Sequence, residues 1–272
     1  MEIEATAARE AAGAEAPSAV RPLEATPDRS VGASVTGLVA AGTLVLAWAT
    51  ILAVGFTRGV EGLGVVGAAV LVVLSVFVHT GLFITVHDAL HGTVCPRWPR
   101  LNRLVGRVVA RLYAGFSWGR LLERHIRHHR FPGTALDPDH HAPGSPGVVR
   151  WYVRFVGEYV TWGQLLWMAV AFNVLSHAVG VAEGRLLLFW VLPALLSTVQ
   201  LFVFGTWLPH RTPEGGHDNA HHARSAAFPP WLSFVTCYHF GYHHEHHALP
   251  AVPWWRLPAA RRRLAALQDT GG

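Results

Sequence analysis

The chain has 272 residues, of which 51% are hydrophobic and 14% are charged, with a formal net charge of +5 at pH 7. Soluble domains usually carry about 25% charged residues, so this composition argues against a large soluble core and favours contact with lipid. The two cysteines, Cys95 and Cys237, form no CxxC pair, which argues against a disulfide framework or a cysteine-rich zinc site.

The N-terminal residues 1–33 are expected to form a mobile tail, because they are rich in Ala, Glu and Pro and show no sustained apolar period. They lack the basic start and early apolar core of a secretory signal. We expect one membrane domain over residues 34–258 and a C-terminal tail over 259–272.

Four stretches without Asp, Glu, Lys or Arg follow the tail, at 31–57, 62–86, 159–182 and 186–209. Crossing a hydrocarbon core takes about 20 helical residues, so each is long enough. The alternative, four buried helices of a soluble protein, is less favoured because such helices are seldom apolar around their whole circumference. The prediction is an all-α integral membrane protein with spans at about 35–56, 64–86, 161–181 and 186–208.

Two short links, 58–61 and 183–185, pair these spans into two helical hairpins. Most arginines lie in the segment 88–158 between the hairpins and in the region after residue 209. Because Lys and Arg near spans favour the cytosol, both termini and the middle segment are predicted to be cytosolic.

The middle segment contains an amphipathic pattern at 101–112, where Leu and Val recur at helical spacing and arginines line the opposite side. This pattern is typical of an interfacial helix lying on the membrane with its arginines towards the headgroups. An amphipathic helix packed on protein fits equally well.

Three histidine clusters stand out, with the sequences HDALH at 87–91, HIRHH at 125–129 and HHEHH at 243–247. Residues three and four apart share one face of a helix, so each cluster can direct two or three imidazoles at one point. The topology, which was inferred without them, places all three on the cytosolic side. His210 lies where the fourth span returns to the same side, so we expect the clusters to converge.

Imidazole ligands suit iron, zinc, copper or nickel. About nine histidines exceed what one ion can use, and a structural zinc site closes with four ligands, so two ions are expected. Carboxylates commonly orient such imidazoles through their second nitrogen. The acidic residues close enough in sequence for this role are Asp88, Glu123, Asp137, Asp139 and Glu245. For Asp137 and Asp139, a loop turn around Pro138 is an equal alternative.

The clusters resemble the histidine boxes of the membrane fatty acid desaturase and hydroxylase superfamily, and the resemblance covers about residues 35–258. Within this superfamily, four regions resemble bacterial β-carotene ketolases: HDALHG at 87–92, HHRFPGT at 128–134 with DPD at 137–139, FGTWLPHR at 204–211, and TCYHFGYHHEHH at 236–247 with VPWWRLP at 252–258. One position departs from the pattern, since His222 stands where the family has Asn.

The resemblance implies an oxygenase that uses dioxygen and external electrons to convert the C4 methylene of a β-ionone ring into a ketone, through two hydroxylations and loss of water. The expected products are echinenone and canthaxanthin, or astaxanthin from a hydroxylated substrate. It also implies two iron ions, for which we expect nine ligands: His87, His91, His125, His128, His129, His210, His243, His246 and His247.

The expected partners are a carotenoid dissolved in the lipid of a bacterial cytoplasmic membrane and a ferredoxin-type electron donor, with no nucleic acid. The arginine-rich face offers a docking surface for an acidic carrier. Anionic lipid headgroups explain the same charge equally well.

Further residues are candidates for orienting ligands or contacting substrate: Asp88, Glu245, His239, Tyr238 and His221. Aromatic residues that could shape a ring pocket are Trp118, Trp207, Tyr238, Phe240 and Tyr242, for which an interfacial aromatic belt is the alternative. His79 and His177 lie inside spans and are interpreted as packing residues. The histidines expected in loops are His140, His141, His217, His221 and His222.

Other functions are compatible with the same pattern. A carotenoid hydroxylase or an acyl-lipid desaturase would carry similar boxes. A zinc-binding membrane transporter or sensor belongs to another class, and transport would favour ionisable residues spread through the membrane depth rather than gathered at one edge.

Overall fold

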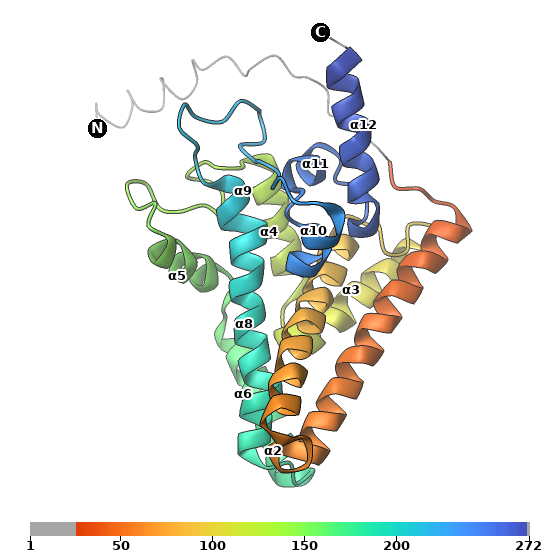
Figure 1. Cartoon of the computed structure of the whole chain (residues 1–272), viewed down its shortest axis with the longest axis vertical. Coiled ribbons are helices and arrows are strands. Elements are labelled where there is room, and N and C mark those ends of the chain that lie inside the picture. The colour runs from red at the N-terminus through yellow and green to blue at the C-terminus, as the bar shows by residue number, and fades with distance from the viewer. Residues whose placement is uncertain (1–25, 271–272) are drawn as a thin grey trace.

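The computed structural model describes residues 26–270, so most of the expected N-terminal tail lies outside the described part. Within residues 26–270 the regular structure is helical, apart from one isolated β-bridge between Ser225 and Tyr242. The helices form a tapering bundle with one broad end, where the C-terminus lies, and one narrow end (Figure 1). This arrangement confirms the predicted all-α class.

The first hairpin is formed by α2 (Val31–Leu90), which begins at the N-cap Ser30 and doubles back at the narrow end (Figure 1). The turn depends on Gly59 and Gly64, whose φ angles of 59° and 69° are readily adopted only by glycine. Arg185 closes the turn by donating to the carbonyl oxygens of Phe56 and Thr57. The chain therefore reverses where the link at 58–61 is expected.

The second hairpin consists of two helical arms. The descending arm is α6 (Trp162–Asn173) continued by the π-helical turn η1 (Val174–Ala178). The returning arm runs from α7 (Glu183–Leu186) through η2 (Leu187–Val191), α8 (Leu192–Leu201) and η3 (Phe202–Trp207) to α9 (Leu208–His210). The connection lies at 179–182, slightly before the expected link, because Gly180 turns with a φ of 82° and the charged residues 183–185 already form the first turn of α7.

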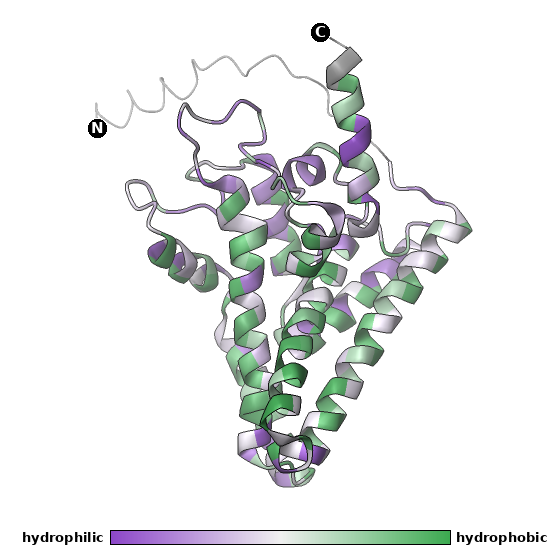
Figure 2. Ribbon diagram, viewed as in Figure 1, coloured by the Kyte–Doolittle hydropathy of each residue, from purple (hydrophilic) through white to green (hydrophobic). Residues whose placement is uncertain are grey.

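By length and composition, two helices of the described residues could cross a membrane, Val31–Leu90 with 60 residues and Glu183–His210 with 28 residues. Large apolar side chains on the hairpins face outwards, and Val65 and Val66 are 77% and 78% exposed. Figure 2 shows hydrophobic residues along both hairpins and hydrophilic residues gathered at the broad end. An apolar outer surface of this kind fits lipid rather than water.

The remaining helices lie between and beyond the hairpins: α3 (Pro99–Ala114), α4 (Trp118–Arg130), α5 (Val148–Tyr159), α10 (Pro230–Cys237), α11 (His243–Ala248), η4 (Trp254–Arg256) and α12 (Leu257–Thr270). Helix α3 matches the amphipathic segment 101–112, burying Val109 and Ala110 and exposing Leu104 and Val108. The C-terminal segment expected as a tail is helical in α12 through Thr270.

The main core joins the second arm of α2 to α3, α4 and the segment after α10. Its fully buried members include Leu82, Ile84, Tyr113 and Leu121, with Tyr238 at 2% exposure. Burial of large side chains of this kind contributes about 1.5–3 kcal/mol each. This core includes side chains from the last turns of α2 and from the first turn of α4, and so fixes two of the helices that carry the histidine clusters.

Candidate metal centre

Four helical segments bring the nine expected histidines to the broad end of the molecule. The end of α2 supplies two of them, α4 three, α9 one and α11 three, which are His87 and His91, His125, His128 and His129, His210, and His243, His246 and His247. Two consecutive left-handed residues, Tyr238 and His239, reverse the chain between α10 and α11. This reversal turns α11 back towards α2 and α4.

The histidines separate into two groups, each with one ligand nitrogen per residue within 4.8 Å of all the others. Group one consists of His87, His91, His125, His129 and His246. Group two consists of His128, His210, His243 and His247. Helices α4 and α11 contribute to both groups, because neighbouring positions on a helix point in different directions.

The close approach of ring nitrogens fits a metal ion better than hydrogen bonding. The Nε2 atom of His247 lies 3.1 Å from Nε2 of His128 and 3.1 Å from Nε2 of His243. A neutral imidazole carries one N–H, and one proton between two nitrogens satisfies a single pair. In group two, Nε2 of His210 is buried without a hydrogen-bond partner in the described chain. A cation bound by these nitrogens would satisfy all four.

Group one shows the same feature. The Nε2 atoms of His91 and His125 are 2.6 Å apart, and those of His129 and His246 are 3.0 Å apart. The rings of His87 and His125 lie edge to face with centroids 4.6 Å apart. Five neutral nitrogen donors around one point suit iron, zinc, copper or nickel, so the residues present fit two such ions.

The second ring nitrogen of several ligands is held by an oxygen atom. Nδ1 of His128 lies 2.9 Å from Oδ1 of Asp137, and Nδ1 of His210 lies 2.8 Å from the carbonyl oxygen of His222. Nδ1 of His87 lies 3.3 Å from Oδ1 of Asp88. Such bonds place the proton on Nδ1 and leave Nε2 free to bind metal.

Burial controls the protonation of the ligands on α4 and α9. Burial and the neighbouring histidines hold the pKa of His125 and of His129 well below the usual value, and burial lowers the pKa of His210 to about 3. His128 differs: burial alone lowers its pKa, but the carboxylates of Asp137 and Asp139 outweigh burial and raise it to about 9. Neutral rings are the form that binds metal, so most of the set is ready for an ion.

The segment 133–139 is both a loop turn and a support for His128. Besides contacting His128, the carboxylate of Asp137 accepts from the backbone N–H groups of Gly133 and Asp139, each at 2.9 Å. Asp139 accepts a hydrogen bond from the Tyr159 hydroxyl. Asp137 therefore takes part in the loop turn and also orients an imidazole. Tyr159 is a further residue of this region, which the histidine spacing did not indicate.

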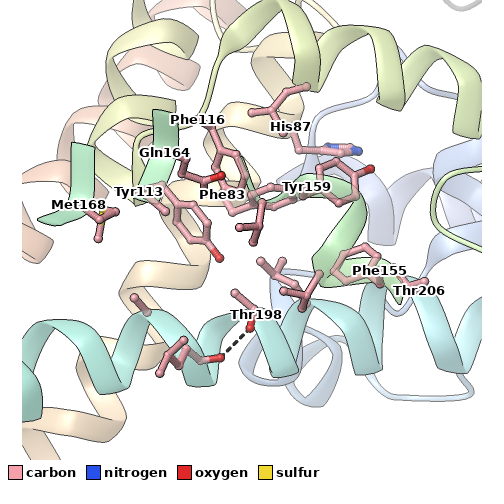
Figure 3. A pocket seen from close by; sticks show the side chains of 18 of the residues that line it. Phe83, His87, Tyr113, Phe116, Phe155, Tyr159, Gln164, Met168, Thr198 and Thr206 are labelled. Carbon is pink, nitrogen blue, oxygen red and sulfur yellow. Dashed lines mark hydrogen bonds between the residues drawn. The ribbon is translucent and has the colours of Figure 1, made fainter. Parts of the chain in front are cut away.

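A cavity of about 610 Å³ leads from the histidines into the space between the hairpins. Its metal-side wall includes His87, His125, His128, His243 and His246. Most of the remaining wall is aromatic or aliphatic, and Figure 3 shows Phe83, Tyr113, Phe116 and Tyr159 along it. An apolar cavity with a few polar groups at one end is typical of a site for a small apolar ligand.

The other candidate residues lie around this site with different roles. Asp88 contacts His87 and also accepts from the backbone N–H of Trp254 at 3.1 Å, which attaches η4 to the end of α2. Glu245 accepts from the Ser225 hydroxyl and pairs with Arg261 at 3.5 Å, so it connects α11 to α12 rather than contacting a ligand histidine.

Three further candidates lie outside both groups. The Tyr238 hydroxyl donates to the carbonyl oxygen of Phe77 at 3.1 Å, deep in the core. His239 stacks on Tyr242 with ring centroids 5.7 Å apart. His221 lies 5.9 Å from the ring of His247. Of the aromatic residues expected to surround a substrate ring, Phe240 lines the cavity, whereas Trp118, Trp207, Tyr238 and Tyr242 are absent from its described lining.

The histidines inside the hairpins behave differently from the ligands. His79 is buried, and its Nδ1 accepts from the indole N–H of Trp48 at 3.1 Å, as a packing residue would. His177 lies on η1 with an exposed side chain. Both lie away from the two groups.

His222, the residue at the family's Asn position, acts through its backbone. Its φ of 44° is left-handed, a conformation that Asn adopts more readily than most residues. Its carbonyl oxygen orients His210, and its side chain stacks on His217 with centroids 5.4 Å apart. The Asn in the family pattern was the available signal that this position needs a special backbone conformation.

Comparison with known proteins agrees with the site. The model of the family described as fatty acid desaturase matches residues 62–173 and 149–272. A β-carotene ketolase from one strain of Paracoccus sp. is 41% identical over 238 residues, covering 85% of this chain and 94% of the relative. A β-carotene ketolase from a second Paracoccus strain is 48% identical over 183 residues, covering 67% and 74%. A zeaxanthin 4-ketolase from Chlamydomonas reinhardtii is 40% identical over 232 residues, covering 83% of this chain and 48% of the relative.

Proposed function

This chain belongs to the fatty acid desaturase family, and on that premise we propose that it is a β-carotene ketolase. It oxidises the C4 methylene of a β-ionone ring to a ketone, converting β-carotene to echinenone and canthaxanthin. Relatives named as β-carotene and zeaxanthin ketolases support an oxidoreductase that acts on carotenoid rings, and hydroxylated rings would lead to astaxanthin.

The observation that carries this proposal is the position of the nine histidines at one end of an apolar cavity. The two groups would hold two iron ions, group one with five imidazoles and group two with four. When bound, the irons would let dioxygen and external electrons oxidise the substrate. Such chemistry is needed because the C–H bond resists acids and bases. The protein binds the substrate, orients it and excludes water.

The residues around the site perform these tasks. The apolar wall binds the ring and the adjoining polyene, and its aromatic side chains exclude water from the reacting carbon. Asp137 and the His222 carbonyl hold their imidazoles in one orientation, so that the ligands need little rearrangement. Asp139, which accepts from Tyr159 and lies 3.7 Å from Nδ1 of His128, lines the cavity together with Tyr159.

We also propose that the domain at 34–258 spans a bacterial cytoplasmic membrane four times, with both termini and the metal centre cytosolic. The exposed apolar surface of the two hairpins supports this topology, as does the gathering of polar residues at the broad end (Figure 2). A substrate dissolved in the bilayer could then enter the cavity from between the hairpins. The orientation is tested by labelling single cysteines in four variants. Glu61→Cys and Glu183→Cys lie in the short links on the predicted outer side, and Arg127→Cys and Arg262→Cys lie on the predicted cytosolic side.

The electron donor would dock on the same broad end. Exposed arginines at that end are Arg127, Arg130, Arg211, Arg262 and Arg263. An acidic ferredoxin would associate faster with such a surface at low salt. Turnover that slows steeply with ionic strength supports this docking, whereas turnover independent of salt leaves lipid headgroups as the explanation for the charge.

The proposal is tested by expressing the chain in a host that accumulates β-carotene and analysing the pigments. Ketones at C4 are the expected products. Hydroxylated rings without ketones would favour a carotenoid hydroxylase, and desaturated lipids with unchanged carotene would favour an acyl-lipid desaturase. Active protein that contains zinc without iron would contradict the proposed oxygenase.

A further inference from the structure

Helix α3 has three faces, which its helical repeat places roughly a third of a turn apart. The first face is buried against the rest of the protein and includes Asn102, Gly106 and Val109. The second face is apolar but exposed, and it consists of Leu101, Leu104 and Val108. The third, the arginine face, is also exposed and consists of Arg100, Arg103 and Arg107. The amphipathic pattern therefore packs on protein along one side and leaves two different surfaces exposed.

The first half of α3 lies at the level where the second apolar stretch ends. The side-chain amide of Asn102 donates to the carbonyl oxygen of Ala89 at 2.7 Å and accepts from the backbone N–H of Cys95 at 3.0 Å. A Cβ atom on Gly106 would lie 2.8 Å from that of Ala89, so α3 and α2 cross in contact there (Figure 1). Ala89 follows the apolar stretch 62–86 by three residues. In the proposed topology, this crossing lies where hydrocarbon gives way to headgroups.

The arginine face has no counter-charge among the residues that the structure describes. Helix α3 contains no Asp or Glu, and within residues 26–270 the three side chains of the arginine face form no ion pair or hydrogen bond. Arg111, one turn further along, differs because it donates to the carbonyl oxygen of Gly115 at 3.2 Å and lies 5.8 Å from the ring centroid of Trp167. Arg103 and Arg107 are four residues apart and so are neighbours on the helix surface. The arginine face thus offers guanidinium donors that the described chain does not use.

We propose, on the basis of the proposed membrane topology, that the arginine face binds the phosphate group of an anionic phospholipid whose acyl chains lie against the exposed apolar face of α3. Guanidinium groups match the geometry of phosphate oxygens and bind them with charge-assisted hydrogen bonds. The apolar face beside them suits acyl chains. Trp98, which is 44% exposed just before α3, extends this apolar surface with a residue type enriched at membrane interfaces.

The apolar face distinguishes a lipid from the other anions that arginines attract. A free phosphate ion would neutralise the arginines but leave Leu104, which is 56% exposed, and Val108, which is 49% exposed, without an apolar neighbour. An acidic electron carrier would bring a hydrated surface to a helix that lies at the level of the headgroups. A phospholipid satisfies both faces at once, and each arginine near an anionic membrane surface strengthens the attraction about fivefold.

The test uses the purified chain, stripped of lipid, in a neutral detergent. Fluorescence anisotropy follows the binding of chain-labelled phosphatidylglycerol and, for comparison, chain-labelled phosphatidylcholine. Wild type should bind phosphatidylglycerol more tightly, and Arg103→Gln/Arg107→Gln should weaken that binding about 25-fold, because two arginines are lost. Arg262→Gln/Arg263→Gln is the matched control, since it removes the same charge from exposed positions on α12. The control should bind both lipids as wild type does.

Equal binding of the two lipids by wild type would overturn the proposal, whatever the folding of the variants. Unchanged binding in Arg103→Gln/Arg107→Gln would refute the role of the arginine face, and an equal loss in the α12 control would reduce the preference to net charge. Displacement of the lipid by millimolar inorganic phosphate, but not by chloride at equal ionic strength, would assign the arginine face to free phosphate instead. Cysteine labelling of the hairpin links reports the topology independently, so a wrong topology and a missing lipid site are distinguishable.

Discussion

The two histidine groups differ in how the protein holds them. All four members of group two are buried, and two of them are oriented by oxygen atoms at 2.9 Å or less, from Asp137 and from the His222 carbonyl. In group one, three of five members are partly exposed, and its orienting contact, from Asp88 to His87, is 3.3 Å long. Group two is therefore a more deeply buried site with two oriented ligands, whereas group one has more imidazoles and more of them partly exposed.

The largest expected effect is the loss of a ligand from either group. We predict that His246→Ala, in group one, and His128→Ala, in group two, each abolish ketone formation and each reduce the iron content by about one ion per chain. The reason is that each imidazole occupies a coordination position that water does not fill equivalently. Pigment analysis and iron determination on purified protein check both, with His177→Ala as the control for an exposed histidine.

Near-normal ketone production by either variant would remove that residue from the ligand set. Loss of both irons from one substitution would show that the two groups form one cooperative unit rather than two separable sites. Membrane insertion of the variants should match wild type, because the substituted residues lie beyond the apolar parts of the hairpins.

The second prediction concerns the orientation of group two. Asp137→Asn should lower iron affinity or activity by about 10–100-fold, because the His128 imidazole loses the carboxylate that fixes its Nδ1 proton. Asp139→Asn should have a smaller effect, since its carboxylate lies 3.7 Å from the same nitrogen. Iron titration followed by activity measurement distinguishes the two, and equal effects would mean that the loop, rather than the Asp137 contact, holds His128.

Chelation separates the groups by accessibility. We expect a strong chelator to remove about half of the iron quickly, from the partly exposed group one, and the remainder slowly, from the buried group two. Iron content against time, together with Mössbauer spectra of the remaining ion, checks this order. Removal of all the iron in one phase would show that the difference in burial has no kinetic consequence.

The smallest effects are expected at His222. His222→Asn should keep activity within about twofold of wild type, because Asn tolerates the left-handed backbone and preserves the carbonyl that orients His210. His222→Val should lose about 1–2 kcal/mol of stability, since a β-branched residue resists that conformation. Thermal unfolding in detergent is the measurement, and equal melting temperatures for the two variants would contradict the backbone explanation.

Much of this arrangement could be predicted from the sequence, because it depends on local patterns. The apolar stretches predicted the hairpin arms. The histidine clusters, His210 at the end of the fourth stretch and the family resemblance together predicted the nine residues that the structure brings together. The division into two groups was less accessible. His125 and His129 share a helix face, but His128 points about 60° away from His125, and which metal group it joins depends on where α11 and α9 lie.

Contacts between residues far apart in the sequence could not be predicted, because they depend on backbone angles and on how the helices pack. The support of His128 by Asp137 was one of two open interpretations, and the role of the His222 carbonyl depends on a backbone angle that composition does not specify.

The most direct test of two histidine groups holding a working pair of irons is the metal content of purified protein that still converts β-carotene to a ketone. Two irons per chain are expected, with Mössbauer signals from two environments of nitrogen ligands. Fully active protein with a single iron, or with zinc in place of iron, would contradict the two-group centre.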